Sequence, residues 1–96
     1  MGSELLPAEL LEARKKIDRI DEDLLVLLAE RFALTHRVGI LKASNGLEAV
    51  DEVREAQKLA ELSTQSEKHG LNPEFITELF SHIMKEVVKN HRQLRG

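Results

Sequence analysis

The chain has 96 residues, of which 42% are hydrophobic, 32% are charged and none is cysteine. This length allows one small domain, and the missing cysteine excludes disulfide frameworks, thiolate metal sites and cysteine nucleophiles. The formal net charge of −3 and the aromatic content of only 3% argue against a protein that binds nucleic acid or an anionic membrane surface.

The start of the chain carries no recognisable targeting signal. No apolar run approaches the roughly 18 residues of a membrane span, and residues 1–7 lack the pattern of a secretory signal. We therefore expect a cytoplasmic protein that does not contact the membrane. Met1-Gly2-Ser3 is interpreted as a remnant of cloning at the start of an N-terminal tail over residues 1–7, and residues 8–96 are expected to form a single domain with no room for a regulatory one.

Three helices and no strand are predicted. The first begins after Pro7, covers about residues 8–43 and meets no helix breaker before Ser44-Asn45-Gly46. At 1.5 Å per residue it would be about 50 Å long, whereas a compact domain of this size has a radius of gyration of roughly 13 Å. A second chain is therefore expected to cover it.

The second and third helices are predicted at about residues 51–68 and 73–94. Asp51 is the expected N-cap of the second helix, and Gly70 follows its last turn. Asn72-Pro73-Glu74 starts the third helix, whose apolar residues recur at helical spacing. The expected fold class is all-α.

Three cations interrupt the apolar stripe of the first helix: Arg14, Arg31 and Lys42. Any one of them could cover apolar surface with its stem and extend its charge to water. Arg31 and Lys42 are three turns apart on one face, about 16 Å along the axis, so long side chains could converge on one small ligand. Arg14 lies about 25 Å before Arg31 and would reach the same ligand only from another subunit.

Further candidate residues follow along the chain. Asp51, Arg54 and Glu55 lie at i, i+3 and i+4 and would form one patch, for which a cap and a surface ion pair are the simpler interpretation. His91 continues the apolar stripe of the third helix, where a histidine is more often a helix-end residue than a functional one. The other three histidines have no metal-ligand spacing, so no metal site is predicted: His36, His69 and His82.

Together these residues resemble the all-helical chorismate mutases. The similar segments are Arg14-Lys-Lys-Ile-Asp-Arg-Ile-Asp21, Leu24-Leu-Val-Leu-Leu-Ala-Glu-Arg31, Val38-Gly-Ile-Leu-Lys42, Asp51-Glu-Val-Arg54-Glu55-Ala and Leu79-Phe80. The resemblance covers about residues 8–92. Each segment is weak alone, but their order and spacing are specific, and they include the cations on the apolar stripe.

The resemblance implies three helices per subunit, interlocked into a homodimer with two shared active sites. It implies that Arg14 from the partner subunit and Arg31 hold the two carboxylates of chorismate. Lys42 would contact a carboxylate and the ether oxygen, and Glu55 and Asp51 would address the ring hydroxyl, with Arg54 nearby. The implied reaction is the rearrangement of chorismate to prephenate in aromatic amino acid (Phe/Tyr) biosynthesis, which uses no metal and no cofactor.

Two positions depart from the family pattern. Val87 stands where a serine is often found, which removes only a secondary carboxylate contact. His91 stands where a glutamine or glutamate donates to the ether oxygen. Because a neutral imidazole has one N–H donor and an imidazolium has two, we expect His91 to replace the amide and, with Lys42, to be catalytic.

Two rival functions stay open at this point. An isochorismate pyruvate lyase or an aminodeoxychorismate mutase would reuse the carboxylate-binding arginines on the same fold. The set of Asp51, Arg54 and Glu55 favours a ring hydroxyl in the chorismate position. A non-catalytic helical dimerisation or regulatory module is the rival from another class, and it would need no cations on the inner face.

Overall fold

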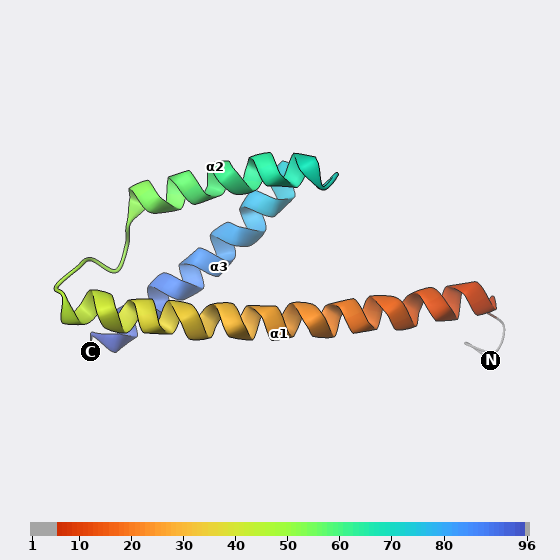
Figure 1. The fold of residues 1–96 in the computed structure, drawn as a ribbon, viewed down its shortest axis with the longest axis horizontal. Coiled ribbons are helices and arrows are strands. Elements are labelled where there is room, and N and C mark those ends of the chain that lie inside the picture. Colours follow the sequence, from red (N-terminus) through yellow and green to blue (C-terminus); the bar gives the residue numbers. More distant parts are fainter. Residues whose placement is uncertain (1–5, 96) are drawn as a thin grey trace. The chain divides into compact units, whose positions relative to one another are not determined.

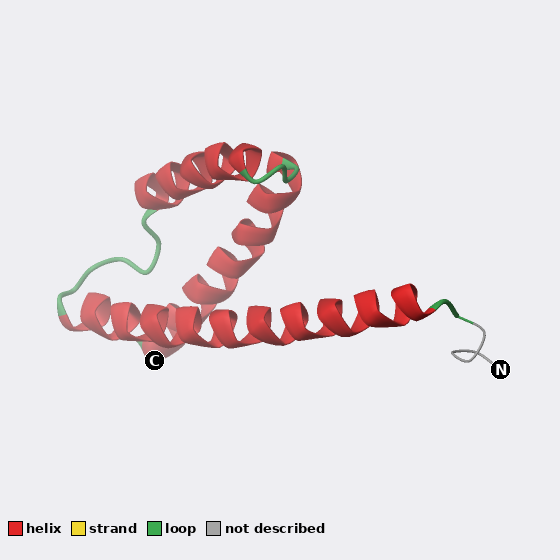
Figure 2. Cartoon of the chain, turned by 45° about the vertical axis from the view of Figure 1, so that its right-hand side comes forward, coloured by secondary structure: helices red, strands yellow, loops and turns green. Residues whose placement is uncertain are grey.

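The computed structural model describes residues 6–95 and contains three helices in chain order (Figure 1). They are α1 (Ala8–Ser44), α2 (Glu52–Lys68) and α3 (Pro73–Leu94), and no strand occurs over residues 6–95 (Figure 2). The all-α class and the very long first helix are confirmed. The helix ends agree with the predicted ones to within one residue, and the suspected cloning remnant, Met1-Gly2-Ser3, lies outside the described residues.

The chain divides into two parts between Ala33 and Leu34, inside α1. The first part is the N-terminal two thirds of α1, and the second contains the end of α1 together with α2 and α3.

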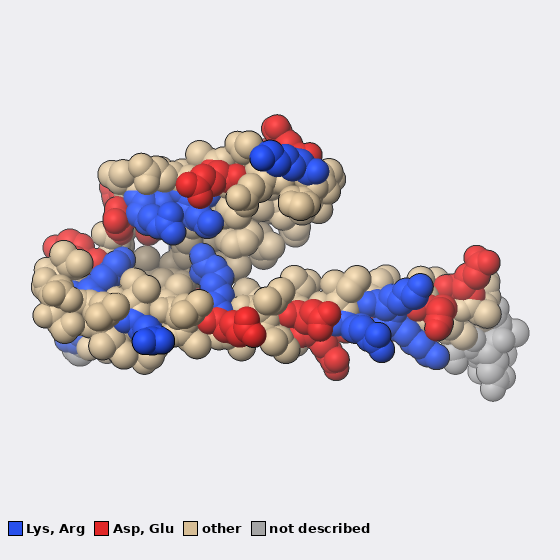
Figure 3. Space-filling view, in the orientation of Figure 1, with Lys and Arg blue, Asp and Glu red and all other residues tan. Residues whose placement is uncertain are grey.

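The first part consists of a single helix that carries an apolar stripe. Lys and Arg side chains alternate with Asp and Glu along its surface (Figure 3). Its apolar stripe is largely open to solvent, with Ile17 55%, Ile20 58% and Leu24 53% exposed. Burying a leucine or isoleucine side chain is worth about 1.5–3 kcal/mol, so covering this stripe would stabilise the helix.

The second part is organised around the packing of α2 against α3 (Figures 1 and 2). Leu62 of α2 and Met84 of α3 are buried, as is Ala49 of the segment that joins α1 to α2. No described apolar side chain is less than 2% exposed, so this core is small for the length of the chain. Gly70, with φ +69°, and the N-cap Asn72 form the turn that starts α3.

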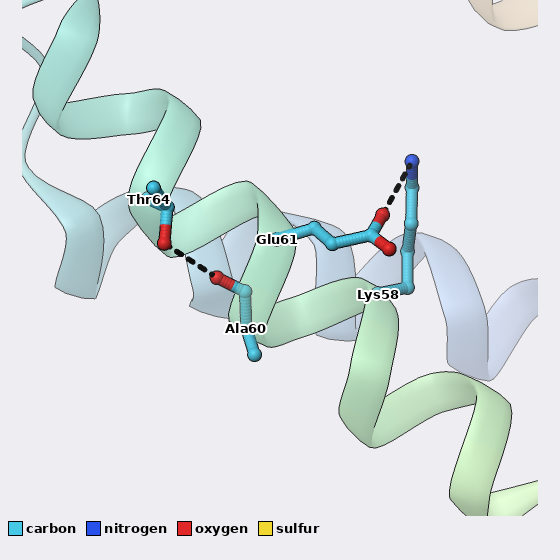
Figure 4. Close-up of polar contacts among 4 residues, drawn as sticks. All are labelled: Lys58, Ala60, Glu61 and Thr64. Carbon is cyan, nitrogen blue, oxygen red and sulfur yellow. Dashed lines mark hydrogen bonds and ion pairs between the residues drawn. The ribbon is translucent and has the colours of Figure 1, made fainter.

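The outer face of α2 is polar. Lys58 and Glu61 form an ion pair of 3.9 Å between Nζ and Oε2, and the Thr64 hydroxyl donates to the Ala60 carbonyl at 3.3 Å (Figure 4). Both residues of the ion pair are partly exposed, so the pair contributes at most about 1 kcal/mol to stability. The polar face of α2 is thus directed to solvent, and α3 packs against another face of the helix.

Two further properties apply to residues 6–95. No helix in this range is both long and apolar enough to cross a membrane. No group of three or more His, Asp or Glu side chains in the same range is arranged to hold a metal ion.

Candidate active site

Lys42 lies at the end of α1, where the chain turns toward α2. Its side chain is half-buried, and Nζ donates to the Ala49 carbonyl oxygen at 3.3 Å. The Leu47 N–H donates to the Lys42 carbonyl at 2.8 Å, so the joining segment folds back over the last turn of α1. A hollow of about 440 Å³ opens here, lined by Lys42, Leu47, Glu48, Val50, Asp51, Glu52 and Val53. The ammonium group of Lys42 is thus beside an accessible space next to the start of α2.

Asp51 is the N-cap of α2, as predicted. Its backbone is extended, with φ −122° and ψ 91°, and Oδ1 accepts from the Arg54 N–H at 3.0 Å. One carboxylate oxygen therefore satisfies a free amide of the first turn. The Asp51 carbonyl also accepts the Glu55 N–H at 3.0 Å, while the Arg54 side chain is exposed.

Glu55 is half-buried and faces α3. It contributes to a second hollow, of about 720 Å³, lined by Val50, Glu55, Met84, Lys85, Val88, Lys89, Arg92 and Gln93. Val50 lines both hollows, which places the Lys42 side and the Glu55 side next to each other. The walls combine apolar side chains with cations from α3, an environment suited to a small anionic ligand.

His91 is buried against α1, with 3% of its surface exposed. Its Nε2 lies 2.8 Å from the Thr35 carbonyl oxygen, and a Cβ atom on Gly39 would come within 2.5 Å of its Cδ2. Val87, one turn earlier on α3, is half-buried. The imidazole therefore occupies the space that Gly39 leaves on α1.

Six of the eight predicted residues lie in the second part. Lys42 and Asp51 line the smaller hollow and Glu55 the larger one, whereas Val87 and His91 line neither, and Arg54 is exposed on α2. Arg14, which is exposed, and Arg31, which is half-buried, lie in the first part of the chain.

Sequence reasoning missed the backbone groups of the site. The Thr35 carbonyl accepts from His91, and the Ala49 carbonyl accepts from Lys42. The pattern of side chains along a sequence does not indicate which backbone carbonyl will accept from a distant residue. The cations of α3 that line the larger hollow had a readable signal, because they recur at i, i+4 and i+7: Lys85, Lys89 and Arg92.

The described residues thus form three helices, with the half-buried Lys42 near the end of α1 and Asp51 as the cap of α2. The family model for chorismate mutase type II matches residues 13–92, and the chain belongs to this family. The family expected from the sequence is thereby confirmed.

Several named proteins are similar in sequence to most of this chain. The chain is 38% identical over 79 residues to the T-protein of Enterobacter agglomerans, a match that covers 82% of this chain and 21% of that protein. It is 39% identical over 85 residues to the bifunctional chorismate mutase/prephenate dehydratase of Escherichia coli (strain K12), covering 88% and 22%. The T-protein of Haemophilus influenzae is 31% identical over 84 residues, covering 88% and 22%. The chain thus spans about a fifth of the length of these relatives.

Proposed function

We propose that this chain catalyses the rearrangement of chorismate to prephenate in aromatic amino acid biosynthesis. The observation that carries the proposal is the placement of Lys42 beside Asp51 at one hollow, with Glu55 at the adjoining one, in a chain of the chorismate mutase type II family. The reaction is an intramolecular change of bonds that needs a shaped, charged pocket. The relatives that match this chain include a protein named for chorismate mutase activity.

Each charged residue has a role in the proposed site. Arg31 and the Arg14 of a second copy bind the two substrate carboxylates, because a guanidinium fork grips a carboxylate through two hydrogen bonds. Lys42 binds a carboxylate and the ether oxygen as a compact positive charge. Glu55 accepts from the ring hydroxyl, and Asp51 assists through its backbone or through water, with Arg54 at the rim.

Catalysis in this site has two parts. The first is to hold the substrate in its chair-like conformation, so that the entropy cost of adopting this conformation is met on binding. The second is to place hydrogen-bond donors at the ether oxygen, where they stabilise the negative charge that develops in the transition state. Enzymes commonly lower the barrier by at least about 8 kcal/mol, of which one such donor supplies about 3–4 kcal/mol. Lys42 is the first donor, and His91 is the second through its ring N–H.

A homodimer with shared sites is part of this proposal. The apolar stripe of α1 continues past the first part of the chain, where Leu34 is 61% and Leu41 60% exposed. An apolar stripe of this length on a 37-residue helix is stable in water only when another apolar surface covers it. A second copy of the chain would provide such a surface. Arg14, about 25 Å from Arg31 along the helix, then reaches the site of the other copy. The cytoplasmic location expected from the sequence stays a prediction.

The direct test is the loss of chorismate absorbance on adding the purified protein, followed by identification of the product. Prephenate formation supports the proposal. Release of pyruvate from isochorismate, or turnover of aminodeoxychorismate in preference to chorismate, would assign a related enzyme of the same fold. A protein that turns over none of the three and melts at the same temperature with and without them would be a non-catalytic helical module.

A further inference from the structure

The tautomer of His91 follows from its hydrogen bond to α1. A backbone carbonyl oxygen can only accept, so the 2.8 Å contact between Nε2 and the Thr35 oxygen requires a proton on Nε2. This bond joins α1 to α3 across 56 residues of sequence, and the ring is 3% exposed. The donor nitrogen is therefore held in one direction while the ring is in this position.

Gly39 makes this position available. A Cβ atom there would lie 2.5 Å from Cδ2 and 2.9 Å from Nε2 of His91, both far inside van der Waals contact. Gly39 follows Thr35 by four residues and so lies on the same face of α1. We call this pair, the Thr35 carbonyl and the open face of Gly39, the imidazole seat. It admits the Cδ2–Nε2 edge of the ring and turns that edge toward α1.

The opposite edge of the ring has no such contact. Nδ1 is buried and has no hydrogen-bond partner among the described residues. A proton on Nδ1 would bury an N–H without an acceptor, which is costly, so this edge also favours the proton on Nε2.

We propose that the imidazole seat is a positioning device, which keeps a proton on Nε2 of His91 and turns this N–H toward the face of α1 that carries Lys42. The proposal rests on the proposed function in one respect, the identity of the acceptor. When substrate binds, the N–H exchanges the Thr35 carbonyl for the ether oxygen, so the donor nitrogen stays Nε2. Thr35 and Gly39 act through His91 and do not touch the substrate.

The test reads the tautomer without any substrate. Long-range ¹H–¹⁵N NMR spectra of the full chain are recorded above about pH 8, where a free imidazole is neutral, and the His91 signals are assigned by their loss in His91→Gln. The expected spectrum shows a protonated Nε2 and an unprotonated Nδ1. A protonated Nδ1 would overturn the proposal. In Gly39→Ala, the expected result is a mixture of tautomers, and an unchanged spectrum would show that the seat does not position the ring.

If the protein does not turn over chorismate, the proposed function fails, and the NMR test still decides the seat.

Discussion

Gly39 of α1 and His91 of α3 are in close contact, because a Cβ atom at position 39 would lie 2.5 Å from Cδ2 of the imidazole and 2.9 Å from Cδ1 of Leu94. A glycine inside a helix costs about 1 kcal/mol relative to alanine. The close approach of two helices explains why this cost is accepted at position 39. Because of this contact, a side chain placed at position 39 should have a measurable effect on stability.

Gly39→Ala should destabilise the protein despite the better helix propensity of alanine. Overpacking of this kind costs about 1–3 kcal/mol in the free energy of unfolding, which outweighs the gain of about 1 kcal/mol from propensity. Urea denaturation of both proteins at one concentration measures the difference. In a His91→Ala background the ring is absent, so Gly39→Ala should cost less or become stabilising. Equal effects in both backgrounds would contradict the contact.

His91→Ala should reduce kcat/KM by about a hundredfold or more, because it removes a donor to the ether oxygen. His91→Gln should keep most of the activity, since its amide N–H can donate in the same direction. Steady-state kinetics with chorismate compares the two variants at a temperature where both are folded. Small and equal losses in both would mean that His91 only joins α3 to α1.

The sequence was sufficient to predict the helices of this chain because their boundaries are set by local chemistry. Asp51 and Asn72 cap α2 and α3, and Gly70 has the positive φ that the turn between them needs. The cations on the stripe of α1 were equally readable, because helical spacing assigns a face to each residue. The partner of His91 was not readable, since the Thr35 oxygen belongs to the backbone and the bond depends on how α3 crosses α1.

Mixing two inactive variants should restore activity if the sites are shared between subunits. A heterodimer of Arg14→Ala and Lys42→Ala contains one intact site, made from the Lys42 of one subunit and the Arg14 of the other. After unfolding and refolding at equal amounts, half of the dimers are mixed, so about a quarter of the wild-type activity is expected.

The matched control mixes Arg31→Ala with Lys42→Ala. Both residues serve the same site from the same subunit, so every site in that heterodimer keeps one defect and the mixture should stay inactive. Recovery in the control, or no recovery in the first mixture, would contradict the shared site.

Leu24→Lys should prevent dimer formation. Leu24 is 53% exposed in the single chain, so the substitution removes little packing within that chain, but it places a charge on the stripe proposed to meet the second copy. Sedimentation should detect a monomer at concentrations where the wild type is a dimer. Glu22→Lys is the control, because it adds a positive charge on the opposite face of α1 and should remain dimeric. If the Leu24→Lys protein is still a dimer, the dimer interface does not include this part of the stripe.

Asp51 is proposed to act in two ways, as the cap of α2 and as a minor participant in the site, and two substitutions separate these roles. Asp51→Ala removes the acceptor of the Arg54 N–H, 3.0 Å away, and should lower the free energy of unfolding by about 1 kcal/mol. Asp51→Asn keeps an oxygen that can cap the helix, so its stability should stay within a few tenths of a kcal/mol of the wild type. Because Asp51 is proposed to assist only through its backbone or through water, Asp51→Asn should also keep kcat/KM within about tenfold, which corresponds to about 1.4 kcal/mol of transition-state binding. A stable Asp51→Asn protein that loses a hundredfold or more in activity would instead assign the carboxylate a direct role toward the ring hydroxyl.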